Sequence, residues 1–320
     1  METRNQTTIT EFIFLGFHRL QQWKMYFFFL FLLAYGLTIT ANAVIITTVW
    51  RERRLHTPMY FFLSNFSFME IWYTTVTMPK MLSGFLAESN TTISITGCIM
   101  QLYFFFFLGT TECTLLAVMA YDRYIAICSP LHYTTLMNSK VCTQLAVASW
   151  LSCLMAQLPL AISTTWLLFC GPNEINHFFC DLAPVLNLSC TDTSVSEMIF
   201  FTFSWVVILC SFLLTMVSYC SIISTICRMP STTGRHRAFS TCASHLTVVT
   251  IFYSTVTFMY VRPTAHYTFQ EDRVISVFYC VVTPLLNPII YNLRNKEVKE
   301  ALVKSLCSRT RLNQKNFGLS

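Results

Sequence analysis

Seven long segments almost free of charged side chains dominate this chain of 320 residues. Five of them hold no Asp, Glu, Lys or Arg between their end residues, and the other two hold a single glutamate each. A helix needs about 20 mostly apolar residues to cross a lipid bilayer. We therefore predict seven transmembrane helices, within residues 24–51, 56–80, 97–121, 141–173, 198–227, 238–261 and 274–293.

The composition supports a membrane protein. Hydrophobic residues make up 54% of the chain and charged residues 11%, whereas soluble domains carry about 25% charged residues. So few charges leave too little polar surface for a water-soluble particle of this size. Strands of a β-barrel would be about 10 residues long with alternating polarity, and the seven segments have neither property. The expected fold is an all-α bundle of seven transmembrane helices.

Basic residues are concentrated on one side of the predicted bundle. With the N-terminus outside, 15 of the 21 Lys and Arg residues fall on the cytoplasmic side, as the positive-inside rule requires. They are spread over short loops, so the net charge of +6 indicates contact with membrane lipid and no nucleic-acid partner. We expect an extracellular segment (1–24), the transmembrane domain (25–293), and a cytoplasmic amphipathic eighth helix with its tail (294–320).

Two kinds of modification are expected on the outer side. Asn5 begins the glycosylation sequon Asn5-Gln6-Thr7, and further sequons begin at Asn90 and Asn187, near helix ends or in a loop. Four of the 14 cysteines also fall outside, where the environment is oxidising. Their spacing alone leaves three disulfide connectivities open. These cysteines are Cys98, Cys170, Cys180 and Cys190.

Two carboxylates lie inside the predicted membrane region. Glu70 is 14 residues from His56, and Glu112 is 11 residues from Arg123, so both lie roughly 16–21 Å from the cytoplasmic edge. Ionisable side chains at this depth are costly and usually functional. We predict that Glu70 and Glu112 share a cation, with Na⁺ as the candidate, or a proton. The alternative is two neutral acids, each hydrogen-bonded to local hydroxyl groups.

An acid and a base stand side by side where the third segment ends. Asp122 and Arg123 fall at the cytoplasmic interface, where a charged pair is partly solvated. As neighbours they interact locally, and Arg123 becomes available to another partner if the helices separate. The alternative interpretation is an interfacial anchor.

Several strings resemble those of a known receptor family. “MAYDRYIAIC” (119–128) and “NPIIY” (287–291) are similar to rhodopsin-like G-protein-coupled receptors. “LHTPMYFFLSNFSFMEIWYTT” (55–75), “SPLHYTTLMN” (129–138), “RAFSTCASHLTVV” (237–249) and “PLLNPIIYNLRN” (284–295) narrow the resemblance to olfactory (odorant) receptors of the tetrapod-type class II. The resemblance covers the chain from about residue 11 to residue 304.

The resemblance implies roles for particular residues. It pairs Cys98 with Cys180 and Cys170 with Cys190, and it matches Glu70 and Glu112 to a sodium site. Glu70 stands where the wider superfamily usually carries Asp, so the coordination geometry of that site is open. G-protein coupling and activation are implied for Asp122, Arg123, Tyr124, Tyr219, Asn287, Pro288 and Tyr291.

A ligand cavity is expected within the helix bundle. Phe105, Gly109 and Glu112 recur at i, i+4 and i+7, so they share one helix face. Sites of this kind are mostly apolar with few polar groups, although any single aromatic residue here is as readily explained by packing. The resemblance and helical spacing together indicate a cavity lined by Phe105, Phe106, Gly109, Thr110, Phe203, Ser204, Val207, Tyr253, Thr257, Tyr260 and Cys280.

The expected ligand is a small, neutral, mostly apolar volatile compound. Phe105 occupies the position where amine receptors carry an aspartate, and the outer half of the expected cavity holds no Lys or Arg. The resemblance implies signalling through a heterotrimeric stimulatory G protein of the olfactory type, with a rise in cAMP. It also implies a multi-pass plasma-membrane protein of olfactory cilia. No cofactor is expected beyond an allosteric Na⁺.

Two other functions agree less well with the sequence. A channel or transporter would use Glu70 and Glu112 as a cation path, but the sequence has no internal repeat or paired broken helices. A membrane enzyme would need a cluster of His, Cys and acidic residues, and none occurs at metal-ligand spacing. We expect no enzymatic activity, and we interpret His245 as a packing residue.

Overall fold

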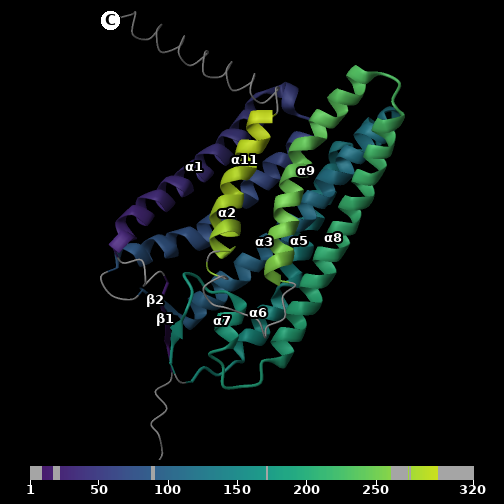
Figure 1. Cartoon of the computed structure of the whole chain (residues 1–320). Helices are drawn as coiled ribbons and strands as arrows, with labels where there is room; N and C mark the ends of the chain where they lie inside the picture. Colours follow the sequence, from purple (N-terminus) through teal and green to yellow (C-terminus); the bar gives the residue numbers. More distant parts are fainter. Residues whose placement is uncertain are drawn as a thin grey trace, which may run out of the picture.

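The computed structural model describes residues 9–16, 22–87, 91–170, 172–260, 273 and 275–294. Most of these residues lie in helices that run side by side in one elongated bundle (Figure 1). Three sequence predictions fall outside the described residues. They are the glycosylation sites at Asn5 and Asn90, and the interfacial helix and tail beyond Arg294.

Each predicted transmembrane segment contains a helix. The fourth is divided in two, because Pro159 lacks the N–H that would continue the ladder from α5 into α6. The long helices are α1 (Lys24–Arg51), α2 (Pro58–Leu86), α3 (Ile95–Cys128), α5 (Ser139–Ala156), α6 (Leu158–Thr165), α8 (Ser194–Arg228), α9 (Thr232–Tyr260) and α11 (Thr283–Arg294), the last preceded by a π-helical turn (Phe278–Val282). Short helices α4 (Tyr133–Leu136) and α7 (Leu182–Leu186) lie between them.

Local sequence explains where several helices begin. The Ser94 hydroxyl accepts a hydrogen bond of 3.1 Å from the N–H of Gly97 at the start of α3. Asn138 caps α5 in the same way, accepting from the N–H of Val141 at 3.0 Å. These side chains satisfy backbone donors that have no partner within the helix. At the start of α2, Pro58 occupies a position where no such donor is needed.

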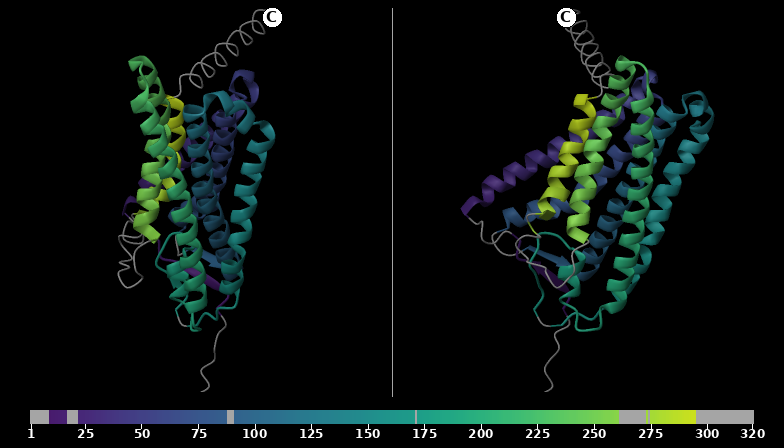
Figure 2. Two further views of the ribbon diagram at one scale, coloured as in Figure 1. Left: turned by 90° about the vertical axis from the view of Figure 1, so that its right-hand side faces the viewer. Right: turned by 45° about the vertical axis from the view of Figure 1, so that its right-hand side comes forward.

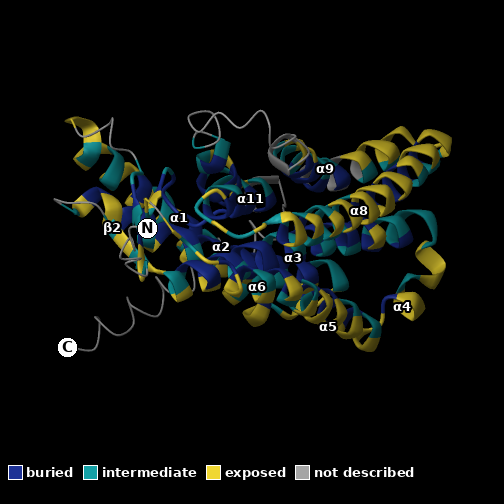
Figure 3. Cartoon of the chain, turned by 90° about the horizontal axis from the view of Figure 1, so that it is seen from below, coloured by how far each residue is buried: buried dark blue, intermediate teal, exposed yellow. Residues whose placement is uncertain are grey.

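The surface of the bundle is apolar. Four helical stretches in the described part of the chain are long and apolar enough to cross a membrane, namely α1, α3, the joined α5–α6 and α8. Shorter apolar stretches lie in α9 and at 275–291. Large side chains such as Leu33, Leu213 and Val217 are exposed, and exposed residues lie along the outer faces of the helices in Figure 3. An apolar surface of this extent identifies a membrane protein.

Helix α3 forms the centre of the bundle. Of its most apolar window, 72% is buried, against 22% for α1 and 28% for α8. It packs against α2, α5 and α8, and rings of α2 and α3 (Phe68 and Phe107) meet Trp150 of α5. A functional side chain on α3 is therefore within reach of several other helices.

A small sheet lies at one end of the bundle, where the sequence predicted only an extracellular segment. Strand β1 (Glu11–Phe14) pairs antiparallel with β2 (Thr91–Ser94) and parallel with β3 (Glu174–Ile175), giving the order β2-β1-β3. Phe12 is fully buried, with its ring edge-to-face against Phe169. The N-terminal strand is thus fixed to the loops after α2 and α6.

Loops predicted to lie on the same side of the membrane gather at the same end of the molecule. The sheet and α7 lie at one end, and the turn between α8 and α9 and the last turn of α11 lie towards the other (Figures 1 and 2). This separation matches the predicted division into outer and cytoplasmic loops.

Candidate functional site: a cavity between α3, α8 and α9

A cavity of about 60 Å³ lies within the bundle. Its walls come from α2, α3, α8, α9 and the segment that contains the π-helical turn and α11. Aromatic and aliphatic side chains supply most of the wall, with a few hydroxyl groups, one thiol and one carboxyl group. The lining residues are Tyr73, Phe105, Phe106, Gly109, Thr110, Glu112, Cys113, Ser204, Ile208, Phe252, Thr255, Val256, Tyr279 and Thr283.

Five of the eleven predicted ligand contacts line this cavity. Four are on α3, whose inward face was assigned from the spacing of Phe105, Gly109 and Glu112. Gly109 leaves open space, because a Cβ atom built there would meet no other atom within 4 Å. The five residues are Phe105, Phe106, Gly109, Thr110 and Ser204.

The inward faces of α8 and α9 differ from the prediction by one residue. Ser204 and Ile208 line the cavity on α8, whereas Phe203 and Val207 lie on the neighbouring stripe. One residue rotates a helix face by about 100°, since a turn contains 3.6 residues. A shift of the same size, in the opposite direction along the sequence, occurs on α9, where the lining residues are Phe252, Thr255 and Val256.

Three of the four remaining predicted contacts, on α9 and in the seventh segment, lie elsewhere. The Tyr253 ring packs edge-to-face on Phe212 of α8, and Thr257 is exposed. The side chain of Tyr260 lies outside the described part of the chain. Cys280 is fully buried in the π-helical turn but does not line the cavity.

The two buried glutamates lie within electrostatic reach of each other, and Glu112 lines the cavity. Both are buried, and the Asn287 amide donates a hydrogen bond of 2.5 Å to Oε1 of Glu70. Glu112 lies within electrostatic reach of Glu70 and interacts with the same amide. Among the described residues, Oε2 of Glu70, Oε1 of Glu112 and Oδ1 of Asn287 have no hydrogen-bond donor. Three oxygen atoms with free lone pairs and no hydrogen-bond donor suit a small hard cation.

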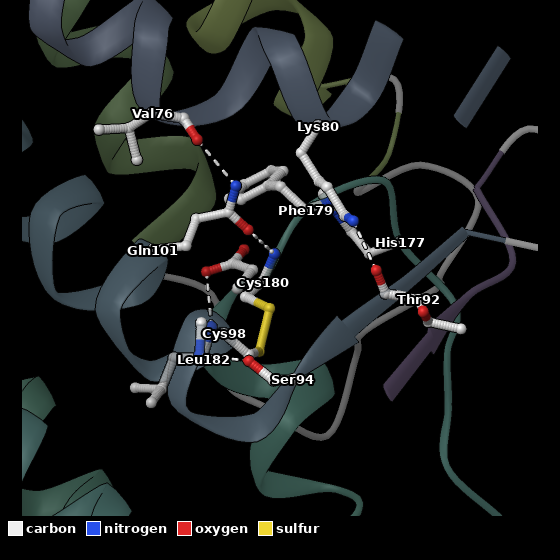
Figure 4. The surroundings of a disulfide bond; sticks show 12 residues. Val76, Lys80, Thr92, Ser94, Cys98, Gln101, His177, Phe179, Cys180 and Leu182 are labelled. Carbon is white, nitrogen blue, oxygen red and sulfur yellow. Dashed lines mark hydrogen bonds between the residues drawn. A yellow bond between two sulfur atoms is a disulfide. The ribbon is translucent and has the colours of Figure 1, made fainter. Parts of the chain in front are cut away.

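A loop that packs on the lining residue Phe105 through Phe179 is held to α3. Cys98 and Cys180 form a disulfide, with Cα atoms 5.5 Å apart, and Cys170 pairs with Cys190. Gln101 strengthens the first link in two directions, because its amide donates to the Val76 carbonyl at 2.8 Å and accepts from the Cys180 N–H at 3.0 Å (Figure 4). The loop is therefore fixed to both α2 and α3.

His177 holds the same loop to the seventh segment. Its Nδ1 accepts from the Phe179 N–H at 3.4 Å, so Nε2 carries the proton and donates to the Ser276 hydroxyl at 3.1 Å. Burial, with the positive charge of Arg273, lowers the pKa of His177 to about 3. The loop contact thus depends on a neutral imidazole.

Polar side chains connect α3 to α4 and α8 to α9 at the cytoplasmic end. Arg123 pairs with Asp122 at 3.6 Å, and the Tyr133 hydroxyl donates to the other Asp122 oxygen at 2.8 Å. Between α8 and α9, the Tyr219 hydroxyl and Nδ1 of His245 are 2.6 Å apart and form a hydrogen bond. Arg123 lies within electrostatic reach of His245.

The other residues with an implied role in activation lie on two elements. Tyr124 is half-buried on α3 and packs on a cluster between α3, α8 and α9. Pro288 lies inside α11, and the Tyr291 ring meets Phe66 of α2 with centroids 6.0 Å apart.

Sequence reasoning missed several of these polar contacts. His245 was interpreted as packing, although it bonds to a tyrosine already assigned a role. Gln101, Tyr133 and His177 were not singled out, because their partners lie 11 to 99 residues away in the sequence. A buried polar residue beside an apolar run was the available signal.

Comparison with known proteins agrees with this architecture. A family model described as olfactory receptor matches residues 31–309. Human olfactory receptor 6B1 is 52% identical over 312 residues, covering 97% of this chain and 99% of that protein. Rat olfactory receptor 226 is 50% identical over 310 residues, covering 96% and 95% respectively. Human olfactory receptor 11L1 is 51% identical over 304 residues, covering 95% and 94%.

The match extends over nearly the whole chain, and the family is one of G-protein-coupled signalling receptors, with no enzymes among the relatives named. The apolar helices, the paired outer cysteines and the central cavity all agree with it. This chain belongs to the olfactory receptor family.

Proposed function

We propose that this receptor binds a small, neutral, mostly apolar volatile compound in the cavity between α3, α8 and α9. The observation that carries the proposal is the cavity wall, where Phe105, Phe106 and Phe252 face a few hydroxyl groups. Among the lining residues that the structure describes there is no Lys or Arg, so a ligand carboxylate would have no cationic partner among them. The volume of about 60 Å³ favours a compact ligand.

Ligand binding activates a heterotrimeric stimulatory G protein of the olfactory type and raises cAMP. The seven helical segments cross the plasma membrane with the N-terminus outside, and residues 294–320 form the interfacial helix and tail. The hydrogen bond between Tyr219 and His245 supports a switch here, because it joins α8 to α9 beside Arg123. An agonist that favours separation of these helices gives the G protein access to Arg123. The expected location is the ciliary membrane of olfactory neurons, with Asn5 glycosylated.

The test of this function is a cAMP reporter assay with a broad panel of neutral volatile compounds. Cells would express the receptor with olfactory trafficking helpers, and an Arg123→Ala variant would be matched for surface expression. A dose-dependent signal that the variant loses supports the proposal. Silence of the wild-type receptor at confirmed surface expression contradicts it.

We also propose that Glu70, Glu112 and Asn287 hold an allosteric Na⁺. Their oxygens without donors support this, because two buried carboxylates cannot both be charged without a neighbouring cation. Replacing choline with sodium is expected to raise the Tm of the purified receptor, and Glu112→Gln is expected to remove that response. A sodium response that survives this substitution contradicts a shared site.

A further inference from the structure

The polar end of the ligand cavity contains a hydrogen-bond acceptor with no donor. Glu112 lines the cavity and is 4% exposed. Its Oε1 accepts no hydrogen bond from any residue that the structure describes. A buried carboxylate oxygen in this state carries a large desolvation penalty. In the receptor without Na⁺, a ligand that brings a donor to this oxygen removes part of that penalty.

Two of the neighbouring donors form hydrogen bonds with other acceptors. The Asn287 amide donates to Glu70. The Thr110 hydroxyl, on the same helix, donates to the backbone carbonyls of Phe106 and Phe107 at 2.9 and 3.0 Å. At the cytoplasmic end of α3, Arg123 pairs with Asp122 and not with Glu112. None of these interactions reaches Oε1 of Glu112, which is available as an acceptor.

Open space leads to this carboxyl group along α3. Gly109 lies three residues before Glu112, on the same face of the helix. Because a Cβ atom at Gly109 would meet nothing within 4 Å, ligand atoms have room beside the backbone one turn above the carboxyl group. Beyond Gly109 the wall is aromatic, formed by Phe105 and Phe106. The cavity thus has an acceptor at one end and apolar rings at the other.

We propose that Glu112 accepts a hydrogen bond from the ligand, so that the receptor selects small apolar compounds that carry a hydroxyl group. An ether or ketone with the same carbon skeleton has no donor and leaves the oxygen unpaired. Sites with a buried polar group discriminate strongly against such analogues. This inference rests on the proposed function and names the chemical class of its ligand.

Glu70 provides a matched control for Glu112. Both belong to the buried carboxyl pair and to the proposed sodium site, but only Glu112 lines the cavity. Glu112→Gln and Glu70→Gln each replace one carboxyl group by an amide of the same shape. Loss of sodium binding affects both variants, whereas loss of the ligand contact affects Glu112→Gln alone.

The experiment measures cAMP dose–response curves for an alcohol agonist, its O-methyl ether and the corresponding ketone. In the wild-type receptor, the alcohol is expected to be about tenfold more potent or better, as for one hydrogen bond made in a buried site. Glu112→Gln is expected to reduce this potency ratio about tenfold, because the amide also donates to ether and ketone oxygens. Glu70→Gln is expected to keep the ratio.

Three results overturn the inference. In the first, the ether or ketone equals the alcohol on the wild-type receptor, a comparison that needs no variant. In the second, Glu112→Gln keeps the wild-type ratio. In the third, both variants reduce it equally. Any of these three results, obtained with compounds that activate the receptor, overturns the role of Glu112 and leaves the odorant receptor function intact. Silence of the wild-type receptor to the whole panel contradicts both that function and this inference.

Discussion

His177 illustrates how one buried side chain fastens an outer loop to the bundle. The imidazole accepts from the Phe179 N–H and donates to the Ser276 hydroxyl, so both ring nitrogens are used in the neutral form. Protonation would turn Nδ1 into a donor facing another donor. The nearby charge of Arg273 opposes protonation as well. The contact is therefore specific for one protonation state.

This contact predicts that acid destabilises the receptor through His177. The pKa of His177 is about 3 in the folded protein, whereas the ordinary pKa of a histidine, which applies to the unfolded chain, is 6.5. Between these values the unfolded chain binds a proton that the folded protein does not, so the free energy of unfolding falls as pH falls. At a pH of about 5 the loss is about 2 kcal/mol. Comparing the Tm near a pH of about 7.5 with the Tm near a pH of about 5 measures it.

His177→Gln supplies the control, because glutamine keeps hydrogen-bonding groups but does not titrate. The wild-type receptor is expected to lose more Tm on acidification than this variant. An equal loss in both proteins would show that His177 does not titrate as the structure indicates.

At the scale of elements, α8 and α9 are joined near their cytoplasmic ends. The hydrogen bond between Tyr219 and His245 is buried. The side chains around it, Ala120, Ile222 and Cys242, are buried as well. Separation of the two helices breaks this bond and exposes the apolar cluster. Both changes cost free energy, so the hydrogen bond and the apolar cluster stabilise the arrangement in which α8 and α9 are together.

Removing the imidazole is expected to raise basal signalling. His245→Phe keeps a ring of similar size but removes the bond to Tyr219. A buried hydrogen bond contributes about 1 kcal/mol, so the population with separated helices is expected to increase about fivefold. Basal cAMP at matched surface expression measures the change. Basal cAMP equal to or below the wild-type level would contradict this role.

The helix faces that line the cavity show how much of the site the spacing of residues in the sequence predicts. The i, i+4, i+7 pattern on α3 was sufficient, because a small residue and a carboxylate marked its polar, open side. On α8 and α9 nearly every candidate position is apolar or carries a hydroxyl group. The sequence pattern therefore did not show which face of each helix is turned towards the cavity. In the seventh segment the π-helical turn Phe278–Val282 adds a residue per turn, and Tyr279 and Thr283 line the cavity where Cys280 was expected.

At the scale of the molecule, the near-absence of charged residues over seven long segments predicted the helices, since that property is local. The sheet β2-β1-β3 was not predicted, because its strands have two to four residues and pair across long separations. The contact between Asn287 and Glu70 joins residues 217 positions apart. The sequence assigned a role to each of these two residues, but it did not predict the hydrogen bond between them, which depends on how α11 packs against α2.

The central claim is that ligands act from the cavity between α3, α8 and α9. Gly109 tests it directly, because it lines the cavity and a Cβ atom there would meet no other atom within 4 Å, so a larger side chain would extend into the cavity. Gly36 is the matched control, since it is a glycine on α1 with equal freedom around it and lies outside the cavity wall. Leucine favours helix over glycine by about 1 kcal/mol at either site, so neither substitution weakens its helix.

The decisive measurement is the agonist dose–response curve of Gly109→Leu beside Gly36→Leu at matched surface expression. We expect Gly109→Leu to shift the half-maximal concentration at least about tenfold upward for every agonist, and Gly36→Leu to leave it unchanged. Curves for Gly109→Leu that coincide with the wild-type curves would contradict the cavity as the site of ligand action.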